Sequence, residues 1–320
     1  MNRPHAAPST PTVLPPHAPE RGWTHRLLGR FHVTGIFWYR FHAWAAATLP
    51  SALLAPIVWI STTAFFVALI KIRRALGDNL DPVLGRAGLI TRQIRIFRSM
   101  HNFAWCLTER YERLNTSRSF RIDIDTERWR RQFCDGKGFI LITAHIGNYE
   151  VGSMLPAVEE GRTVIVVREQ EVDADAQQFV KEMLDRAGGG RWINHFESDD
   201  AFHGMALLQA LREGAIIGIQ GDRPRQGGRN LEAKIFGMPL QVPSGPASLA
   251  RTAEAALVPA FVFRLGRRHY EVELGDPIRV ARTRDRDRDV AEAMQQVALA
   301  IEAAIRRAPY QWFCFRRLWS

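Results

Sequence analysis

Short apolar runs alternate with longer amphipathic stretches through the second half of the chain. The runs are rich in Ile and Val, as is typical of buried strands, and they lie at residues 138–144, 163–167, 215–219 and 257–263. Between and after them, apolar residues recur at helical spacing, which predicts helices at residues 149–159, 174–187, 200–213, 246–255 and 287–307. Alternating strands and helices are typical of α/β proteins. We therefore expect an α/β fold in which helices flank a mixed sheet.

A long uncharged segment precedes these elements. Residues 41–70 contain no Asp, Glu, Lys or Arg, and residues 51–70 are long enough to cross a bilayer. Basic residues lie on both sides of the segment, so the charge pattern does not orient a single span. Pro50 and Pro56 interrupt the helical pattern, and Trp59 is one of several aromatic residues of the kind found at membrane interfaces. We favour a monotopic anchor or a helical hairpin in one leaflet, with a true span and a buried core helix as the alternatives.

These patterns divide the chain into three predicted parts. Residues 1–22 are rich in proline, lack apolar periodicity and contain no hydrophobic stretch of a secretory signal, so we expect a disordered leader. Residues 23–80 would form the membrane anchor or hairpin, and residues 81–320 would form the main domain. That domain opens with apolar residues three and four apart over residues 87–114, which predicts an amphipathic helix.

The charge balance points to an anionic partner. The chain has 43 Lys plus Arg against 33 Asp plus Glu, a net charge of +10, which favours an acidic protein, a negatively charged membrane surface or nucleic acid. The basic residues are dispersed and no zinc module or RNA-binding signature accompanies them, so we expect no nucleic-acid partner. Cys106, Cys134 and Cys314 lie far apart, which predicts neither a metal site nor a disulfide framework, and favours a reducing compartment.

The clearest chemical motif, His145-Ile-Gly-Asn-Tyr-Glu150, follows directly after the first apolar run. A neutral imidazole can take the proton of an attacking hydroxyl, and a carboxylate on its other nitrogen fixes the tautomer. On a continuous helix His145 and Glu150 would point about 140° apart, so they meet only across a turn. Gly147 permits that turn, and Asn148 can cap a following helix. We expect His145 to be a general base and Glu150 its orienting carboxylate; the alternative is a strand-end histidine with an unrelated surface glutamate.

Further charged residues stand where other predicted strands end. Arg168 follows one apolar run, and Asp222 and Arg223 follow another, at the strand ends where open α/β sheets bind ligands. An arginine there can hold a phosphate or carboxylate through two parallel bonds. Residues 235–246 predict a turn-rich loop and a helix beginning near Pro246, whose amide groups could meet a phosphate or an oxyanion. A rim salt bridge, an internal ion pair and an ordinary turn are the alternatives.

Taken in order, these motifs resemble those of the bacterial lipid A biosynthesis (lauroyl or myristoyl) late acyltransferase family. The resemblance covers roughly residues 30–320. It rests on His145-x4-Glu150, Val-Arg168, Gly-Asp222-Arg223, Phe-Gly-x-Pro239, Gly-Pro-Ala-x-Leu-Ala250, Pro259, Pro309-Tyr-Gln-Trp312 with Arg316-Arg317, and the segment from Arg73 to Leu80. The wider superfamily includes phosphatidylinositol mannoside and glycerolipid acyltransferases, which implies a glycerolipid-acyltransferase-like fold with an N-terminal membrane-associated helical segment. Many lipid A enzymes carry Asp-Gln where this chain carries Asp222-Arg223.

The resemblance also implies an activity. His145 would be the general base on the acceptor hydroxyl, with Glu150 orienting it, and the substrate would contact Asn148, Arg168, Asp222 and Arg223. The acyl donor would be an acyl-carrier-protein or acyl-CoA thioester, with no other cofactor and no metal. The acceptor would be a membrane glycolipid of the lipid A type, and the catalytic domain would act at the anionic cytoplasmic face of the inner membrane.

Direct transfer is the expected mechanism. The chain has no Gly-x-Ser-x-Gly elbow and no cysteine beside a motif histidine, so nothing indicates a covalent acyl-enzyme. Three alternatives to lipid A acylation remain: a lysophospholipid or other glycolipid acceptor, a thioester hydrolase that uses water, and a membrane protein that binds lipid without turnover.

Overall fold

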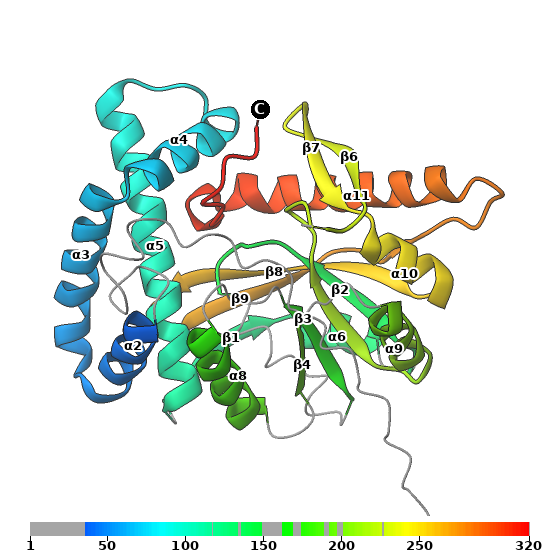
Figure 1. The fold of residues 1–320 in the computed structure, drawn as a ribbon, viewed down its shortest axis with the longest axis horizontal. Helices are drawn as coiled ribbons and strands as arrows, with labels where there is room; N and C mark the ends of the chain where they lie inside the picture. Colours follow the sequence, from blue (N-terminus) through cyan, green and yellow to red (C-terminus); the bar gives the residue numbers. More distant parts are fainter. Residues whose placement is uncertain are drawn as a thin grey trace, which may run out of the picture.

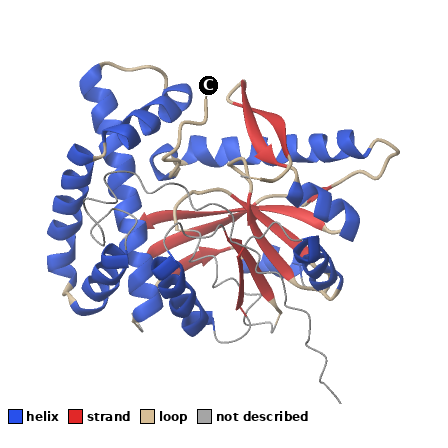
Figure 2. Cartoon of the chain, viewed as in Figure 1, coloured by secondary structure: helices blue, strands red, loops and turns tan. Residues whose placement is uncertain are grey.

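The computed structural model describes residues 36–116, 118–133, 136–148, 162–168, 174–188, 192–196, 201–225 and 227–319. Within them, a large mixed sheet has the strand order β1-β9-β8-β2-β5-β3-β4, and β10 pairs with β8 (Figures 1 and 2). Its strands are β1 (Arg121–Ile124), β2 (Phe139–Thr143), β3 (Val164–Arg168), β4 (Trp192–Phe196), β5 (Ile216–Gln220), β8 (Ala256–Gly266), β9 (His269–Leu274) and β10 (Ile278–Arg279). The α/β fold with a mixed, helix-flanked sheet is confirmed.

The centre of the sheet is parallel. Strand β2 pairs in parallel with both β5 and β8, and β3 pairs in parallel with β5 and β4. β8 and β9 are antiparallel, and β1 pairs in parallel with β9. The central strands are continuous apolar runs because both of their faces are covered, which is why the four strands expected from the sequence all form close to the predicted bounds.

Helices cover both faces of the sheet. One face packs against α10 (Gly245–Ala253) and α11 (Arg286–Arg307), whose apolar stripe includes Met294, Val297 and Ile301. The other face includes Trp129 of α6 (Thr126–Phe133) in its core. Figure 1 shows α8 (Ala174–Gly188) and α9 (Ala201–Arg212) beside the parallel strands. The helices expected at 174–187, 200–213, 246–255 and 287–307 are thus confirmed, whereas the one expected at 149–159 lies outside the described residues.

The N-terminal helices form a group on one flank of the sheet (Figure 1). They are α2 (Ile36–Thr48), α3 (Ser51–Ala68) and α4 (Ile70–Leu84), and they pack with the long helix α5 (Leu89–Asn115). Pro50 directly precedes α3, as the predicted interruption requires, but α3 continues through Pro56, so the interruption predicted at Pro56 is wrong. None of the described helices is by itself long and apolar enough to cross a membrane; α3 and α4 reach the required length only as a pair bent by 94°. The predicted leader, residues 1–22, lies outside the described residues.

One predicted loop is a β-hairpin. The turn-rich loop expected over residues 235–246 instead contains all of β7 (Met238–Pro243), which pairs antiparallel with β6 (Asn230–Ile235). Phe236 and Gly237 form the connection with φ angles of 52° and 76°. Two successive residues with positive φ give a tight turn whose twist matches that of the strands, so the Phe-Gly pair closes a hairpin rather than starting an open loop.

Candidate active site

His145 and Asp222 meet because of the register of two parallel strands. Thr143 of β2 lies opposite Gln220 of β5, and the amide of Gly221 continues the ladder by donating to the Thr143 carbonyl oxygen at 2.8 Å. His145 and Asp222 each follow two residues after this paired position. In neighbouring parallel strands, residues that are equally far from a paired position lie level with each other. The side chains of His145 and Asp222 therefore lie side by side at the edge of the sheet.

Asp222 holds His145 through two bonds. The His145 Nδ1 atom lies 2.7 Å from Asp222 Oδ1, and the His145 backbone amide donates to Asp222 Oδ2 at 3.1 Å. The indole Nε1 of Trp312 also donates to Asp222 Oδ2 at 3.1 Å. A carboxylate on Nδ1 requires the proton on that nitrogen, which makes Nε2 the nitrogen that can accept a proton. The pair therefore has the arrangement of a histidine general base and its orienting carboxylate.

The buried carboxylate of Asp222 stays ionised. Complete burial alone would raise its pKa, but the nearby charge and hydrogen bond of His145, the charge of Arg223 and the hydrogen bond of Trp312 outweigh burial and hold the pKa well below the usual range for aspartate. An ionised partner on Nδ1 stabilises an imidazolium that forms on the same ring, which suits His145 to accept a proton.

The turn after His145 requires glycine. Gly147 has a φ of 60°, and a Cβ atom there would lie 1.9 Å from the Val262 carbonyl oxygen. The Gly147 amide donates to the Gln311 carbonyl oxygen at 2.9 Å, and the Phe313 amide donates to the His145 carbonyl oxygen at 2.8 Å. These two bonds attach the histidine motif to the C-terminal segment that includes the 3-10 helix η3 (Pro309–Gln311). We call residues 309–313 the C-terminal clamp. The backbone bends at Gly147, as predicted, but the remainder of the turn toward Glu150 lies outside the described residues.

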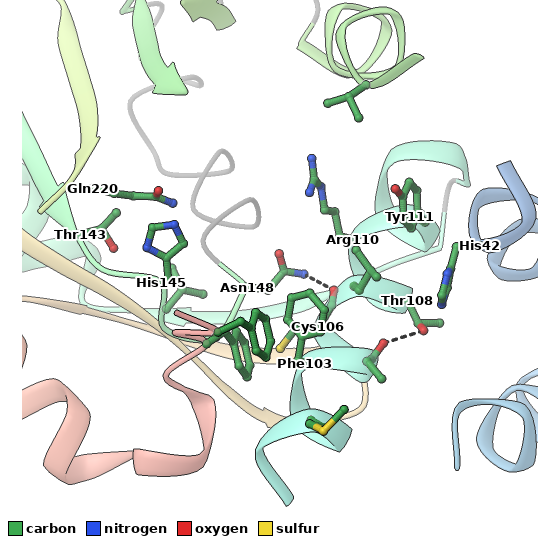
Figure 3. Close-up of a pocket in the computed structure, with 18 of the residues that line it drawn as sticks. His42, Phe103, Cys106, Thr108, Arg110, Tyr111, Thr143, His145, Asn148 and Gln220 are labelled. Carbon is green, nitrogen blue, oxygen red and sulfur yellow. Dashed lines mark hydrogen bonds between the residues drawn. The ribbon is translucent and has the colours of Figure 1, made fainter. Parts of the chain in front are cut away.

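A cavity of about 700 Å³ opens at His145 (Figure 3). It extends between the sheet and helices α2, α3 and α5, and much of its wall is apolar. Figure 3 shows Thr143, His145 and Gln220 grouped in one part of the cavity, with Asn148 between them and α5. Thr143, His145 and Gln220 thus form one polar group on the wall of a largely apolar cavity. Such a cavity suits a long hydrocarbon chain with a polar reactive end.

The structure brings most of the sequence-predicted site residues to this cavity. His145, Asn148, Arg168 and Arg223 line it, and Asp222 lies behind His145. Glu150, which we expected to orient His145, lies outside the described residues, so its role stays a prediction. The described carboxylate on the imidazole belongs to Asp222, which we had placed among the substrate-binding residues.

Two of these residues also bond to the protein. The Asn148 side chain is buried, and its Nδ2 donates to the Cys106 carbonyl oxygen of α5 at 3.1 Å. Arg223 donates from its guanidinium to the Phe313 carbonyl oxygen. Asn148 therefore ties the histidine motif to α5, and Arg223 ties the end of β5 to the C-terminal segment. Their contact with a substrate stays a prediction.

The N-terminus of α10 does not contribute to the cavity. The helix begins at Gly245, close to the position expected, but the residues that line the cavity include neither Gly245 nor Pro246. The helix packs instead against the opposite face of the sheet, where Ala247 and Ala250 join the core shared with α11. The amide groups of this helix are therefore not those that would meet an oxyanion in this cavity.

A buried ionic cluster joins α5 to strands β8 and β9 next to the C-terminal clamp. The Glu109 carboxylate of α5 is fully buried and accepts bonds from Arg264 at 2.9 and 3.1 Å, from the Arg268 amide at 3.0 Å and from the Tyr270 hydroxyl. Burial, Cys106 and the bonded Glu109 raise the pKa of Tyr270 above its usual range, so the phenol stays protonated and donates. Gln311 joins the cluster to the C-terminal clamp, since its side chain bonds both the amide and the carbonyl of Arg264.

Sequence reasoning missed Glu109 and gave Trp312 no role. Glu109 lies within the helical stretch predicted at 87–114, two residues after the apolar Leu107, and no pattern distinguishes it from the other charged residues of that helix. Trp312 belongs to the terminal Pro-Tyr-Gln-Trp motif, and its contact with the site depends on the fold, which the motif does not reveal. Among the described residues, no group of three or more His, Cys, Asp or Glu side chains is arranged to hold a metal ion.

Nearly the whole chain matches one known protein family. A family model described as "Bacterial lipid A biosynthesis acyltransferase" matches residues 24–320, a range that contains all of the site residues above. The match confirms the resemblance drawn from the motifs. No curated protein matches the chain.

Proposed function

The chain belongs to the bacterial lipid A biosynthesis acyltransferase family, and from this membership we propose that it moves a fatty acyl chain from an acyl-carrier-protein or acyl-CoA thioester to a hydroxyl of a lipid A-type glycolipid. Membership makes the chain a lipid acyltransferase; the donor, the acceptor and the base are the parts proposed here. The observation that carries the proposal is the 2.7 Å bond between His145 Nδ1 and Asp222 Oδ1 at the apolar cavity.

The reaction follows from this geometry. His145 Nε2 takes the proton of the acceptor hydroxyl as its oxygen attacks the thioester carbonyl carbon, and the ionised Asp222 stabilises the resulting imidazolium. The tetrahedral intermediate then collapses, the carbon–sulfur bond breaks, and the imidazolium returns the proton to the departing thiolate. The acyl chain ends as an ester on the acceptor, with no covalent acyl-enzyme.

Arginines supply positive charge near the reacting groups. Arg168 ends β3 and Arg223 follows β5, and both line the cavity close to the end of the sheet where His145 lies. A guanidinium binds phosphate through paired hydrogen bonds, so these residues suit the phosphate groups of a lipid A-type acceptor or of a thioester donor. Asn148, which also lines the cavity, is proposed to contact the substrate beside His145.

Helix α3 supports a site next to a membrane. Leu54 and Val58 of α3 are buried and line the cavity, whereas Trp59 and Ile60 on its other side are 55% and 61% exposed. A helix that is apolar all round normally lies in a protein core or a membrane, and more than half of the surface of Trp59 and Ile60 is open to solvent. We propose that this side enters one leaflet as a monotopic anchor, at the cytoplasmic face of the inner membrane.

Basic residues flank the exposed apolar side chains. Lys71 and Arg74 follow α3, and Arg86 precedes the exposed Leu89 and Ile90 at the start of α5; all five side chains are exposed. Anionic headgroups attract such cations at the edge of a membrane-inserted surface. The apolar surface and its basic border together favour a negatively charged membrane as the partner.

The test is acyl transfer with defined donors and acceptors. Purified protein in vesicles is incubated with labelled acyl-carrier-protein or acyl-CoA thioester and with a lipid A precursor, a lysophospholipid or no acceptor, and the acylated lipid is identified by mass spectrometry. We expect the lipid A precursor to be acylated, and His145→Ala to lower the rate by on the order of 10²–10⁴-fold while vesicle binding persists.

The other outcomes separate the alternatives. Acylation of the lysophospholipid alone would assign a glycerolipid acceptor. Release of free fatty acid at the same rate with and without acceptor would assign a thioester hydrolase. A His145→Ala protein with wild-type activity would remove the imidazole from the mechanism.

A further inference from the structure

Gly218 occupies the middle of a buried strand without a backbone reason for glycine. It lies in β5 between Ile217 and Ile219, and its φ angle is not positive. Glycine in a strand interior loses more conformational freedom on folding than other residues and offers no side chain for packing, so it weakens the strand. A residue with a side chain would adopt this backbone conformation without strain.

Packing against the protein does not require glycine at this position either. Among the described residues, the atoms nearest to a Cβ built on Gly218 are Val166 Cγ2 at 3.8 Å and the Ile165 carbonyl oxygen at 3.9 Å. These are ordinary van der Waals distances. By contrast, a Cβ on Gly138 would lie 2.1 Å from the Leu211 carbonyl oxygen, so that glycine is fixed by its neighbours.

The space beside Gly218 belongs to the cavity. Gly218 lies opposite Leu141 of β2 on one side and Val166 of β3 on the other, and all three line the cavity. The neighbouring strands thus present large apolar side chains at this level, and β5 presents only backbone. A strand glycine between larger neighbours marks a place where a ligand approaches the backbone closely.

The position lies below the reactive end of the cavity. Leu141, level with Gly218, precedes His145 by four residues, which corresponds to roughly 13 Å at the rise of an extended strand. The same face of β2 and β5 carries Thr143 and Gln220 one step closer to His145. This face of the sheet is therefore polar near the imidazole and apolar at Gly218. A fatty acyl thioester has the same order, with a polar carbonyl at one end and a hydrocarbon chain beyond it.

We propose that Gly218 determines which acyl chain lengths the enzyme accepts, by leaving room for the hydrocarbon chain where it passes over the sheet. The inference rests on the proposed function, since it assigns this part of the cavity to the acyl chain of the donor. A side chain at position 218 would occupy that space, so the longest acyl chain that the cavity holds would be shorter.

The substitution Gly218→Val tests this. Valine suits a strand, so the sheet should tolerate it. Relative to the wild type, we expect the preferred chain to become shorter, with kcat/KM for longer chains falling by roughly fourfold for each methylene group that no longer fits. The matched control is Gly266→Val, because Gly266 ends β8, does not line the cavity and has open space around a Cβ among the described residues.

Two measurements are made on full-length protein in vesicles with saturated thioesters from octanoyl to palmitoyl, both as acyl-carrier-protein and as acyl-CoA thioesters. The first is the rate of transfer to the lipid A precursor, and the second is binding of the same thioesters followed by thermal stabilisation. A shift to shorter chains in Gly218→Val but not in Gly266→Val supports the inference. An unchanged length profile in both measurements overturns it. If the wild type transfers no acyl chain, the proposed function fails, and the binding series alone then decides whether Gly218 sets the length of a bound chain.

Discussion

The Trp312 indole donates a hydrogen bond to Asp222 Oδ2 at 3.1 Å, on the carboxylate whose other oxygen bonds the imidazole of His145. Both Trp312 and Asp222 are buried. Rotating the buried carboxylate would break one of these bonds, so the indole fixes the plane of the group that orients His145. A residue near the C-terminus thereby acts on the base through its partner.

Trp312→Phe keeps most of the aromatic volume and removes this bond. A hydrogen bond to a charged acceptor contributes about 1.5–3 kcal/mol, so we expect kcat to fall by roughly tenfold to a hundredfold with KM little changed. Trp319→Phe is the control, because its indole nitrogen has no hydrogen-bond partner among the described residues and its ring lies next to that of Trp312. Equal kcat values for the two variants would show that Trp312 acts only through packing.

Two carboxylates can be compared as partners of His145. Asp222→Asn retains the shape of the side chain but no longer requires the proton on Nδ1, so we expect kcat to fall by on the order of 10²–10⁴-fold. Glu150→Gln should cost less, because the described bond to the imidazole comes from Asp222. Steady-state rates of both variants in the transfer assay decide the order. A larger loss in Glu150→Gln would make the motif glutamate the orienting group.

Asp222 also predicts a pH dependence of stability. Its folded-state pKa lies below its ordinary value, so the folded protein keeps the carboxylate ionised at a pH where the unfolded chain has protonated it. The contribution to the free energy of unfolding is complete above about pH 4 and is lost as the pH falls below that value. Denaturant unfolding of Asp222→Asn from pH 3 to pH 7 should show a shallower decline toward acid than the wild type. Parallel curves would contradict this.

The sequence predicted where the reactive groups lie but not which of them meet. His145, Arg168 and Asp222 were each placed after a predicted strand, and the structure puts them there. The pairing of His145 with Asp222 depends on β2 and β5 being neighbours in register, which no local pattern reveals. Proximity along the chain therefore favours Glu150 as the partner of His145. Long-range pairing is the step that periodicity does not supply.

The missed strands have physical reasons of their own. β1 and β9 alternate polar and apolar residues and lie toward one edge of the sheet, so they lack the continuous apolar runs that identify buried parallel strands. β7 contains Pro239 and Pro243, residues that usually argue against a strand. In a two-stranded hairpin that pairs on one side only, a proline can face away from the partner, so the hairpin forms despite both.

The buried Glu109 predicts a large stability cost. Glu109→Ala leaves the guanidinium of Arg264 and the hydroxyl of Tyr270 without their acceptor, and removing one partner of a buried pair typically costs about 3–5 kcal/mol. Glu127→Ala is the control, since Glu127 pairs with Arg130 on the surface and such pairs contribute at most about 1 kcal/mol. Urea unfolding of both variants measures the difference, and similar losses would contradict the structural role of Glu109.

The exposed apolar surface predicts where the protein meets a membrane. Leu89 and Ile90 at the start of α5 are about three-quarters exposed, at 75% and 77%, and α5 packs beside α3, as the ring contact between Trp59 and Phe97 shows. An aspartate at either position adds a charge that the hydrocarbon region excludes and anionic headgroups repel, so Leu89→Asp and Ile90→Asp should weaken binding to anionic vesicles. Leu299→Asp is the control, because Leu299 is an exposed leucine of α11, on the helix that covers the sheet. Co-sedimentation with vesicles measures binding, and wild-type binding by Leu89→Asp and Ile90→Asp would locate the membrane contact elsewhere.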